Sequence, residues 1–136
     1  MAGQPMEGTP VRLLRTAFAV GAVTDGLAVL PFLFPSLARV VWGNAGAGGP
    51  CRLASGYGAS LMLGWTLLLV WAFRKPVERR FVAALTIVVI CGLVLTEVTG
   101  LAGGEFSPRR VAPVLGLQSG LLALFGACLF RRRAVR

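Results

Sequence analysis

The chain has 136 residues, enough for one domain, and 56% of them are apolar while only 14% are charged. Ordinary soluble domains are about 25% charged, so this composition and the mean hydropathy of +0.77 argue against a soluble fold and indicate a membrane protein. The net charge is +9, but the basic residues flank apolar stretches and form no stripe beside exposed aromatic residues. We therefore expect the lipid bilayer as a partner, and no nucleic acid.

Residue types that hold metals and cofactors are scarce. The sequence contains no histidine, which excludes His-ligated haem, His-containing zinc sites and imidazole acid–base catalysis. The three cysteines, Cys51, Cys91 and Cys128, lie far apart and form no CxxC pair, so the sequence gives no sign of a thiol redox site. We expect neither a metal nor a cofactor.

Four apolar stretches are long enough to cross a hydrocarbon core of about 30 Å, which takes about 20 residues. In chain order they cover residues 11–34, 55–73, 81–101 and 108–130, and each is interrupted by at most one acidic residue. The runs are apolar on every side, unlike the alternating strands of a membrane β-barrel. The sequence therefore predicts an all-α integral membrane protein, a single four-helix transmembrane bundle over residues 1–136.

The first span and the connection after it carry two local signals. Pro31 cannot donate a hydrogen bond to the Leu27 carbonyl, so we expect a kink there. The connection between the first two spans has room for a short interfacial helix, with Trp42 at the level of the lipid headgroups, followed by a glycine-rich turn. Trp71, near the end of the second span, is typical of an interfacial anchor, whereas the mid-span Trp65 is expected to pack inside the bundle.

The basic residues divide unequally between the two sides of the membrane. Ten lie on the side of the termini and of the second connection, and four on the other side. Because basic residues accumulate in the cytoplasm, the bias predicts a multi-pass cell-membrane protein with both termini cytoplasmic. The ten are Arg12, Arg15, Arg74, Lys75, Arg79, Arg80, Arg131, Arg132, Arg133 and Arg136, and the four are Arg39, Arg52, Arg109 and Arg110.

Small residues recur at four-residue spacing on two spans. Gly56, Ser60 and Gly64 share one face of the second span, and Gly116 and Gly120 form a GxxxG pattern on the fourth. Such faces allow membrane helices to approach closely. We expect them to pack inside the bundle; the alternative is a homo-oligomer interface.

Polar side chains gather at one level of the predicted bundle. Asp25 follows the start of its span by 14 residues and Glu97 by 16, which places them about 21 and 24 Å from the cytoplasmic edge. Both lie in the outer half of the membrane, and Tyr57, Ser60 and Gln118 reach that half as well. These five are the predicted ligand-binding residues. No catalytic residue is assigned.

An acid at this depth is costly unless it is protonated, paired or hydrated. We expect Arg109 or Arg110 to pair with Glu97, leaving Asp25 as the protonatable or ligand-binding group. A structural network that fixes the helix register explains the same layer equally well.

Three functions fit the sequence. The first is an outward-facing polar pocket that binds or passes a small cation, a proton or a polar lipid-like ligand, and we take it as the leading hypothesis. The second is an accessory or structural subunit of a larger membrane complex. The third is a membrane enzyme that acts on a lipid or a quinone, which the absence of dense acid, histidine or serine clusters disfavours.

Overall fold

The computed structural model describes residues 8–42 and 49–130, which form helices and no strands. Four helical stretches are long and apolar enough to cross a membrane: Val11–Leu33, Cys51–Arg74, Arg80–Ala102 and Pro108–Phe130. They agree closely with the four predicted spans. In chain order the helices are α1 (Thr9–Ala28), α2 (Leu30–Leu33), α3 (Pro35–Trp42), α4 (Gly49–Arg74), α5 (Arg80–Ala102) and α6 (Pro108–Phe130).

The first span is interrupted at Val29, between α1 and α2. Pro31 has no N–H group, so the regular bond to the carbonyl four residues earlier is lost at this point. Phe32 then donates its N–H to the Val29 carbonyl three residues earlier, at 3.0 Å. Leu33 donates to the same carbonyl, at the regular four-residue spacing, at 3.3 Å. The interruption lies within one turn of the kink that Pro31 predicts.

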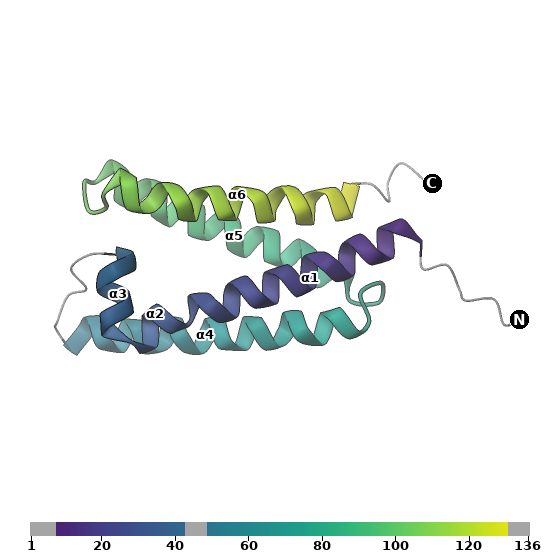
Figure 1. The fold of residues 1–136 in the computed structure, drawn as a ribbon, viewed down its shortest axis with the longest axis horizontal. Coiled ribbons are helices and arrows are strands. Elements are labelled where there is room, and N and C mark those ends of the chain that lie inside the picture. Colours follow the sequence, from purple (N-terminus) through teal and green to yellow (C-terminus); the bar gives the residue numbers. More distant parts are fainter. Residues whose placement is uncertain (1–7, 43–48, 131–136) are drawn as a thin grey trace, which may run out of the picture.

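The connection after the first span contains the predicted short helix, α3. It stands across the axes of the long helices, at the end of the molecule that also holds the α5–α6 loop (Figure 1). Ala38 is buried, whereas Val40 is exposed, so the helix has one packed and one open face. The side chain of Trp42 and the glycine-rich turn after it lie outside the described part of the chain.

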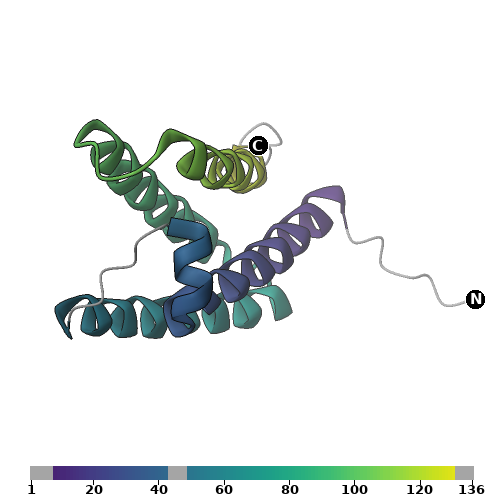
Figure 2. The same cartoon turned by 60° about the vertical axis from the view of Figure 1, so that its left-hand side comes forward.

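The long helices form two pairs. α1 packs along α4, and α5 packs along α6, while α1 also contacts α6 (Figures 1 and 2). α1 begins and α6 ends at the same end of the molecule, opposite α3 (Figure 1). The buried core lies toward that shared end and includes Phe18 and Phe125, whose ring centroids are 6.0 Å apart. Trp65 packs against this core, as the sequence predicts.

The small-residue faces of α4 and α6 point outward, so the prediction that they pack internally is wrong. A Cβ atom added to Gly56 or Gly64 would meet no other helix within 4 Å, and Ser60 is exposed. Gly116 and Gly120 are equally open. Their regular spacing describes a helix face correctly but gives no information on which side that face lies.

One close approach, among three helices, occurs at Gly21 of α1. A Cβ atom there would lie 3.1 Å from the Phe125 ring and 3.4 Å from Leu69, so the absence of a side chain lets α1 contact α4 and α6 together. Close backbone approach of this kind stabilises helix association in membranes, where lipid removes most of the hydrophobic driving force.

The α5–α6 turn is built on Gly104, whose φ of +74° favours glycine. Its N–H donates to Leu101, at 3.1 Å, and the N–H of Glu105 reaches back to Gly100, at 2.9 Å. These two bonds form a Schellman motif that closes α5. Phe106 then folds against Gly100, where any side chain would overlap the ring. The turn thereby fixes the start of α6 beside the end of α5.

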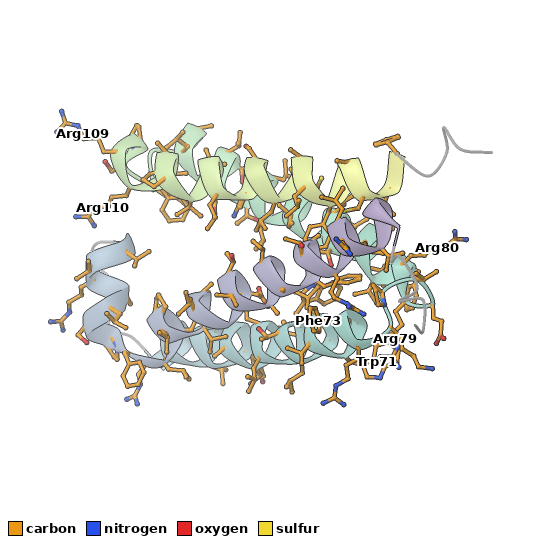
Figure 3. All side chains as sticks on the ribbon, turned by 45° about the vertical axis from the view of Figure 1, so that its right-hand side comes forward. Trp71, Phe73, Arg79, Arg80, Arg109 and Arg110 are labelled. Carbon is orange, nitrogen blue, oxygen red and sulfur yellow. The ribbon has the colours of Figure 1, made fainter. Side chains whose placement is uncertain are left out.

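The opposite end of the molecule is basic and aromatic. The Cζ atom of Arg79 lies 3.4 Å from the centroid of the Trp71 ring, and its Nη1 donates a hydrogen bond to the Trp71 carbonyl. Arg15 lies over Phe73, at 5.7 Å from the ring centroid. Figure 3 shows Arg79 against Trp71 near the α4–α5 turn, with Arg80 farther out. Trp71 is 46% exposed, which fits the predicted interfacial position.

Candidate functional site

A cavity of about 110 Å³ lies between the middle turns of all four spans. Its walls are mostly apolar, with Leu69, Ile90 and Phe125 toward the core. The polar side chains that line it are Thr24, Asp25, Trp65, Thr86 and Gln118. Asp25 is the single ionisable group among these lining residues, so it is the group with which a cation in the cavity would pair.

Asp25 is held between α1 and α4 by Thr66. The Thr66 hydroxyl lies 3.0 Å from Asp25 Oδ2 and 2.9 Å from the Met62 carbonyl. A hydroxyl carries one proton and can donate to one of these acceptors at a time. Both contacts become hydrogen bonds when Thr66 donates to Met62 and a protonated Asp25 donates to Thr66. This arrangement also removes the cost of a carboxylate in the membrane interior.

Glu97 is held between α5 and α6 by Gln118. The Gln118 Nε2 donates to Glu97 Oε1 at 2.9 Å, and Gln118 is only 7% exposed. Two oxygen atoms of this pair remain buried without a hydrogen-bond partner, namely Glu97 Oε2 and Gln118 Oε1. Gln118 lines the central cavity, so the pair connects Glu97 with the cavity that holds Asp25.

The predicted ion pair between Glu97 and Arg109 or Arg110 does not form, and that prediction is wrong. Among the described residues, Glu97 makes its hydrogen bond to Gln118, and the single described ion pair joins Lys75 and Glu78. Gln118 lies eight residues beyond Arg110, about 12 Å deeper along α6. A neutral amide costs far less to bury at that depth than a guanidinium group, which stays near the helix end.

A second, smaller pocket of about 70 Å³ lies at the α3 end of the molecule. Glu97, Ser107 and Arg110 supply its polar lining, and Val41 of α3 contributes to the apolar walls. Val114 lines both this end pocket and the central cavity, so the two spaces are neighbours along α6. Asp25 and Glu97 thus face different spaces and do not share a single one.

The structure does not bring the other two predicted site residues to these spaces. Tyr57 is 65% exposed, Ser60 is exposed, and neither lines the central cavity or the end pocket. The side of α4 that faces the cavity carries Met62, Trp65 and Leu69. Those positions follow helical three- and four-residue spacing, a signal that points to one face but does not identify the inward one.

Sequence reasoning missed Thr66 and Ser107 as site residues, and it treated Trp65 only as a packing residue. Trp65 lines the cavity, and its indole Nε1 is buried without a hydrogen-bond partner. Thr66 is the next residue along α4, and its hydroxyl contacts Asp25. The usable signal was the adjacency of an aromatic N–H and a hydroxyl in the middle of an apolar span.

The described residues contain no group of three or more histidine, cysteine, aspartate or glutamate side chains placed to hold a metal ion. Comparisons with protein-family models, curated proteins and solved structures found no match for the chain. The functional argument therefore rests on the chemistry of the central cavity. That chemistry is a mostly apolar space with one carboxyl group, one unsatisfied amide oxygen and one unsatisfied indole N–H.

Proposed function

We propose that this protein is a membrane-embedded binding protein that accepts a small amphiphilic amine in its central cavity. The observation that carries the proposal is the lining: Asp25 supplies a carboxyl group and Gln118 an amide whose oxygen has no hydrogen-bond partner, in a space whose other walls are mostly apolar. An ammonium group is the cation that such acceptors satisfy, because it has several N–H donors. The apolar part of the ligand packs against residues such as Leu69, Ile90 and Leu93.

The ammonium group takes the place of the Asp25 proton. Without ligand, a neutral Asp25 bonded to Thr66 suits the apolar surroundings. When the ammonium enters, the carboxyl proton leaves to water, the carboxylate pairs with the cation, and the net charge of the cavity stays at zero. The Trp65 ring on the same wall adds an aromatic surface of the kind that binds cations. Binding is therefore coupled to the release of one proton.

Calorimetry on the full chain in lipid nanodiscs tests this proposal, with n-hexylamine as the probe and empty nanodiscs as the baseline for partitioning. We expect about one proton released per bound amine, measured in two buffers of different ionisation enthalpy. Because binding releases a proton, the affinity should rise about tenfold per pH unit wherever free Asp25 is protonated. n-Hexanol, which has no charge, should bind at least about tenfold more weakly.

Asp25→Asn keeps the shape of the side chain and removes the exchangeable proton, so it should abolish the proton release and weaken amine binding at least about tenfold. Glu105→Gln is the matched control, since Glu105 is an exposed acid in the α5–α6 loop. Equal binding of n-hexylamine and n-hexanol would contradict the proposal, as would amine binding that Asp25→Asn leaves unchanged.

We also propose that the protein lies in the cell membrane with its termini in the cytoplasm and the end pocket facing outward. The ten-to-four division of basic residues supports this orientation. The α4–α5 turn, with four of the ten, lies at the end where α1 begins and α6 ends (Figure 1). Arg131, Arg132, Arg133 and Arg136 lie outside the described residues.

Reporter fusions and cysteine labelling test the orientation. A reporter fused after Arg136 should behave as cytoplasmic in intact cells. Cys51, which is exposed at the start of α4, should react with a membrane-impermeant maleimide added from outside. Cys91 is exposed within α5 at mid-span, where lipid surrounds it, and serves as the unreactive control. A C-terminal reporter active outside the cell would reverse the orientation.

A further inference from the structure

The end pocket holds two opposite charges that do not neutralise each other. Glu97 and Arg110 both line it, yet neither forms an ion pair within the described part of the chain. Figure 3 shows Arg110 on the side of α6 that faces α3, whereas its neighbour Arg109 points away from the molecule. Opposite charges kept apart in one pocket fit a ligand that carries both signs.

The acidic side of the pocket has one carboxyl oxygen without a hydrogen-bond partner. Gln118 occupies Glu97 Oε1, at 2.9 Å, while Glu97 Oε2 is buried and has no partner. A buried carboxylate oxygen without a donor costs free energy, so a ligand N–H group at this atom is stabilised. An ammonium with free N–H groups supplies both the donor and the compensating charge.

The basic side of the pocket fits an oxyanion. Ser107 immediately precedes α6, and its carbonyl accepts the N–H groups of Arg110, at 3.0 Å, and Val111, at 3.2 Å. These two N–H groups are therefore occupied, and the 23-residue helix contributes only the positive end of its dipole beside the Arg110 guanidinium. Arg110 and Ser107 both line the pocket, and a guanidinium and a hydroxyl are both donors that phosphate oxygens accept.

The remaining walls are apolar and belong to the surface end of the molecule. Val41, Phe106, Val111 and Val114 surround the charged groups, and α3 lies across this end of the long helices (Figure 1). With the proposed orientation, this is the level of the outer lipid headgroups. A ligand with an anion, a nearby ammonium and an attached apolar chain matches all of these contacts.

We propose that the end pocket is a binding site for the headgroup of a zwitterionic phospholipid with a primary ammonium, that is, a phosphoethanolamine headgroup. Its phosphate contacts Arg110 and Ser107, and its ammonium donates to Glu97 Oε2. A phosphocholine headgroup has no N–H to donate, and a phosphoglycerol headgroup has no cation, so each satisfies only part of the pocket. This site is separate from the amine site at Asp25, and its test does not depend on that site.

Native mass spectrometry of the delipidated full chain tests the proposal, with dioctanoyl lipids of the three headgroups as probes. Phosphatidylethanolamine should bind about tenfold more tightly than phosphatidylcholine or phosphatidylglycerol, because only it has both a phosphate and an ammonium N–H donor. Soluble O-phosphoethanolamine, which lacks the chains, should bind more weakly than the lipid. Equal affinity for the soluble compound would overturn the lipid assignment.

A matched pair of arginine variants and two acid variants locate the contacts. Arg110→Gln should weaken phosphatidylethanolamine binding about tenfold, and the adjacent Arg109→Gln should leave it unchanged. Glu97→Gln should remove the preference for phosphatidylethanolamine over phosphatidylcholine. Equal losses for Arg109→Gln and Arg110→Gln, or tighter binding of phosphatidylglycerol, would show a diffuse basic surface and overturn the proposal. Asp25→Asn, run in parallel, should retain the lipid, which separates this result from the amine test.

Discussion

Gly21→Leu is expected to destabilise the protein by about 2 kcal/mol, the cost of overpacking a close helix contact. A Cβ atom at this position already lies 3.1 Å from the Phe125 ring, and the longer leucine side chain must push α1 away from α4 and α6. Neither neighbour can retreat easily, because Phe125 and Leu69 are themselves fully buried in the core. Unfolding followed by helicity in detergent, with increasing denaturant, measures the change.

Gly64→Leu is the matched control on α4. A Cβ atom there would meet no other helix within 4 Å, so the same substitution should change the stability by less than about 0.5 kcal/mol or raise it slightly through better helix propensity. If Gly64→Leu destabilised the protein more than Gly21→Leu, the result would support the internal packing that the spacing of Gly56, Ser60 and Gly64 predicts. It would contradict the arrangement of α1, α4 and α6 described above.

Gln118→Leu is expected to cost about 2 kcal/mol, because it removes the donor to Glu97 Oε1 while Glu97 Oε2 is already buried without a partner. Combining it with Glu97→Leu should recover most of that loss, since no polar group then remains unpaired. The four proteins of this double-mutant cycle should show a coupling free energy of about 1–2 kcal/mol between the two side chains. The same denaturation measurement gives all four values.

Glu97→Gln separates this pair from the ion pair that the sequence predicts. The amide at position 97 still accepts a bond from Gln118 Nε2, so the stability should stay within about 0.5 kcal/mol of the original protein. If an arginine stabilised Glu97, then Glu97→Gln and Arg110→Gln would both destabilise the protein strongly. That result would contradict the observed hydrogen bond as the main contact of Glu97.

Much of the fold could be predicted from one-dimensional patterns. The four spans follow from the length of the apolar runs, because a bilayer of fixed thickness requires about 20 apolar residues for each crossing. Pro31 gave the interruption of the first span to within a turn, since its missing N–H acts locally. The connection over residues 35–52 was expected to have room for a short helix, and α3 lies there at Pro35–Trp42.

The candidate site could be predicted only in part. The depth of Asp25, Glu97 and Gln118 follows from counting residues along a helix, and all three line the two spaces described. Tyr57 and Ser60 are exposed and line neither space. Sequence reasoning included them because the depth of a residue does not fix the direction in which its side chain points. The partners of the acids, Thr66 and Gln118, depend on which helices are neighbours, which the sequence does not state.

The sequence by itself determined the number, limits and type of the spans, the interruption near Pro31 and the scarcity of metal-binding side chains. Each of these depends on local chemistry or on the length of an apolar run. Only the tertiary structure decided which faces of α4 and α6 are covered, that Gly21 brings α1 close to both of them, and that Glu97 bonds to Gln118. The physical reason is that lipid and protein interiors are equally apolar, so hydropathy cannot distinguish an inward from an outward face. Helix packing makes that distinction through shape and through a few buried hydrogen bonds.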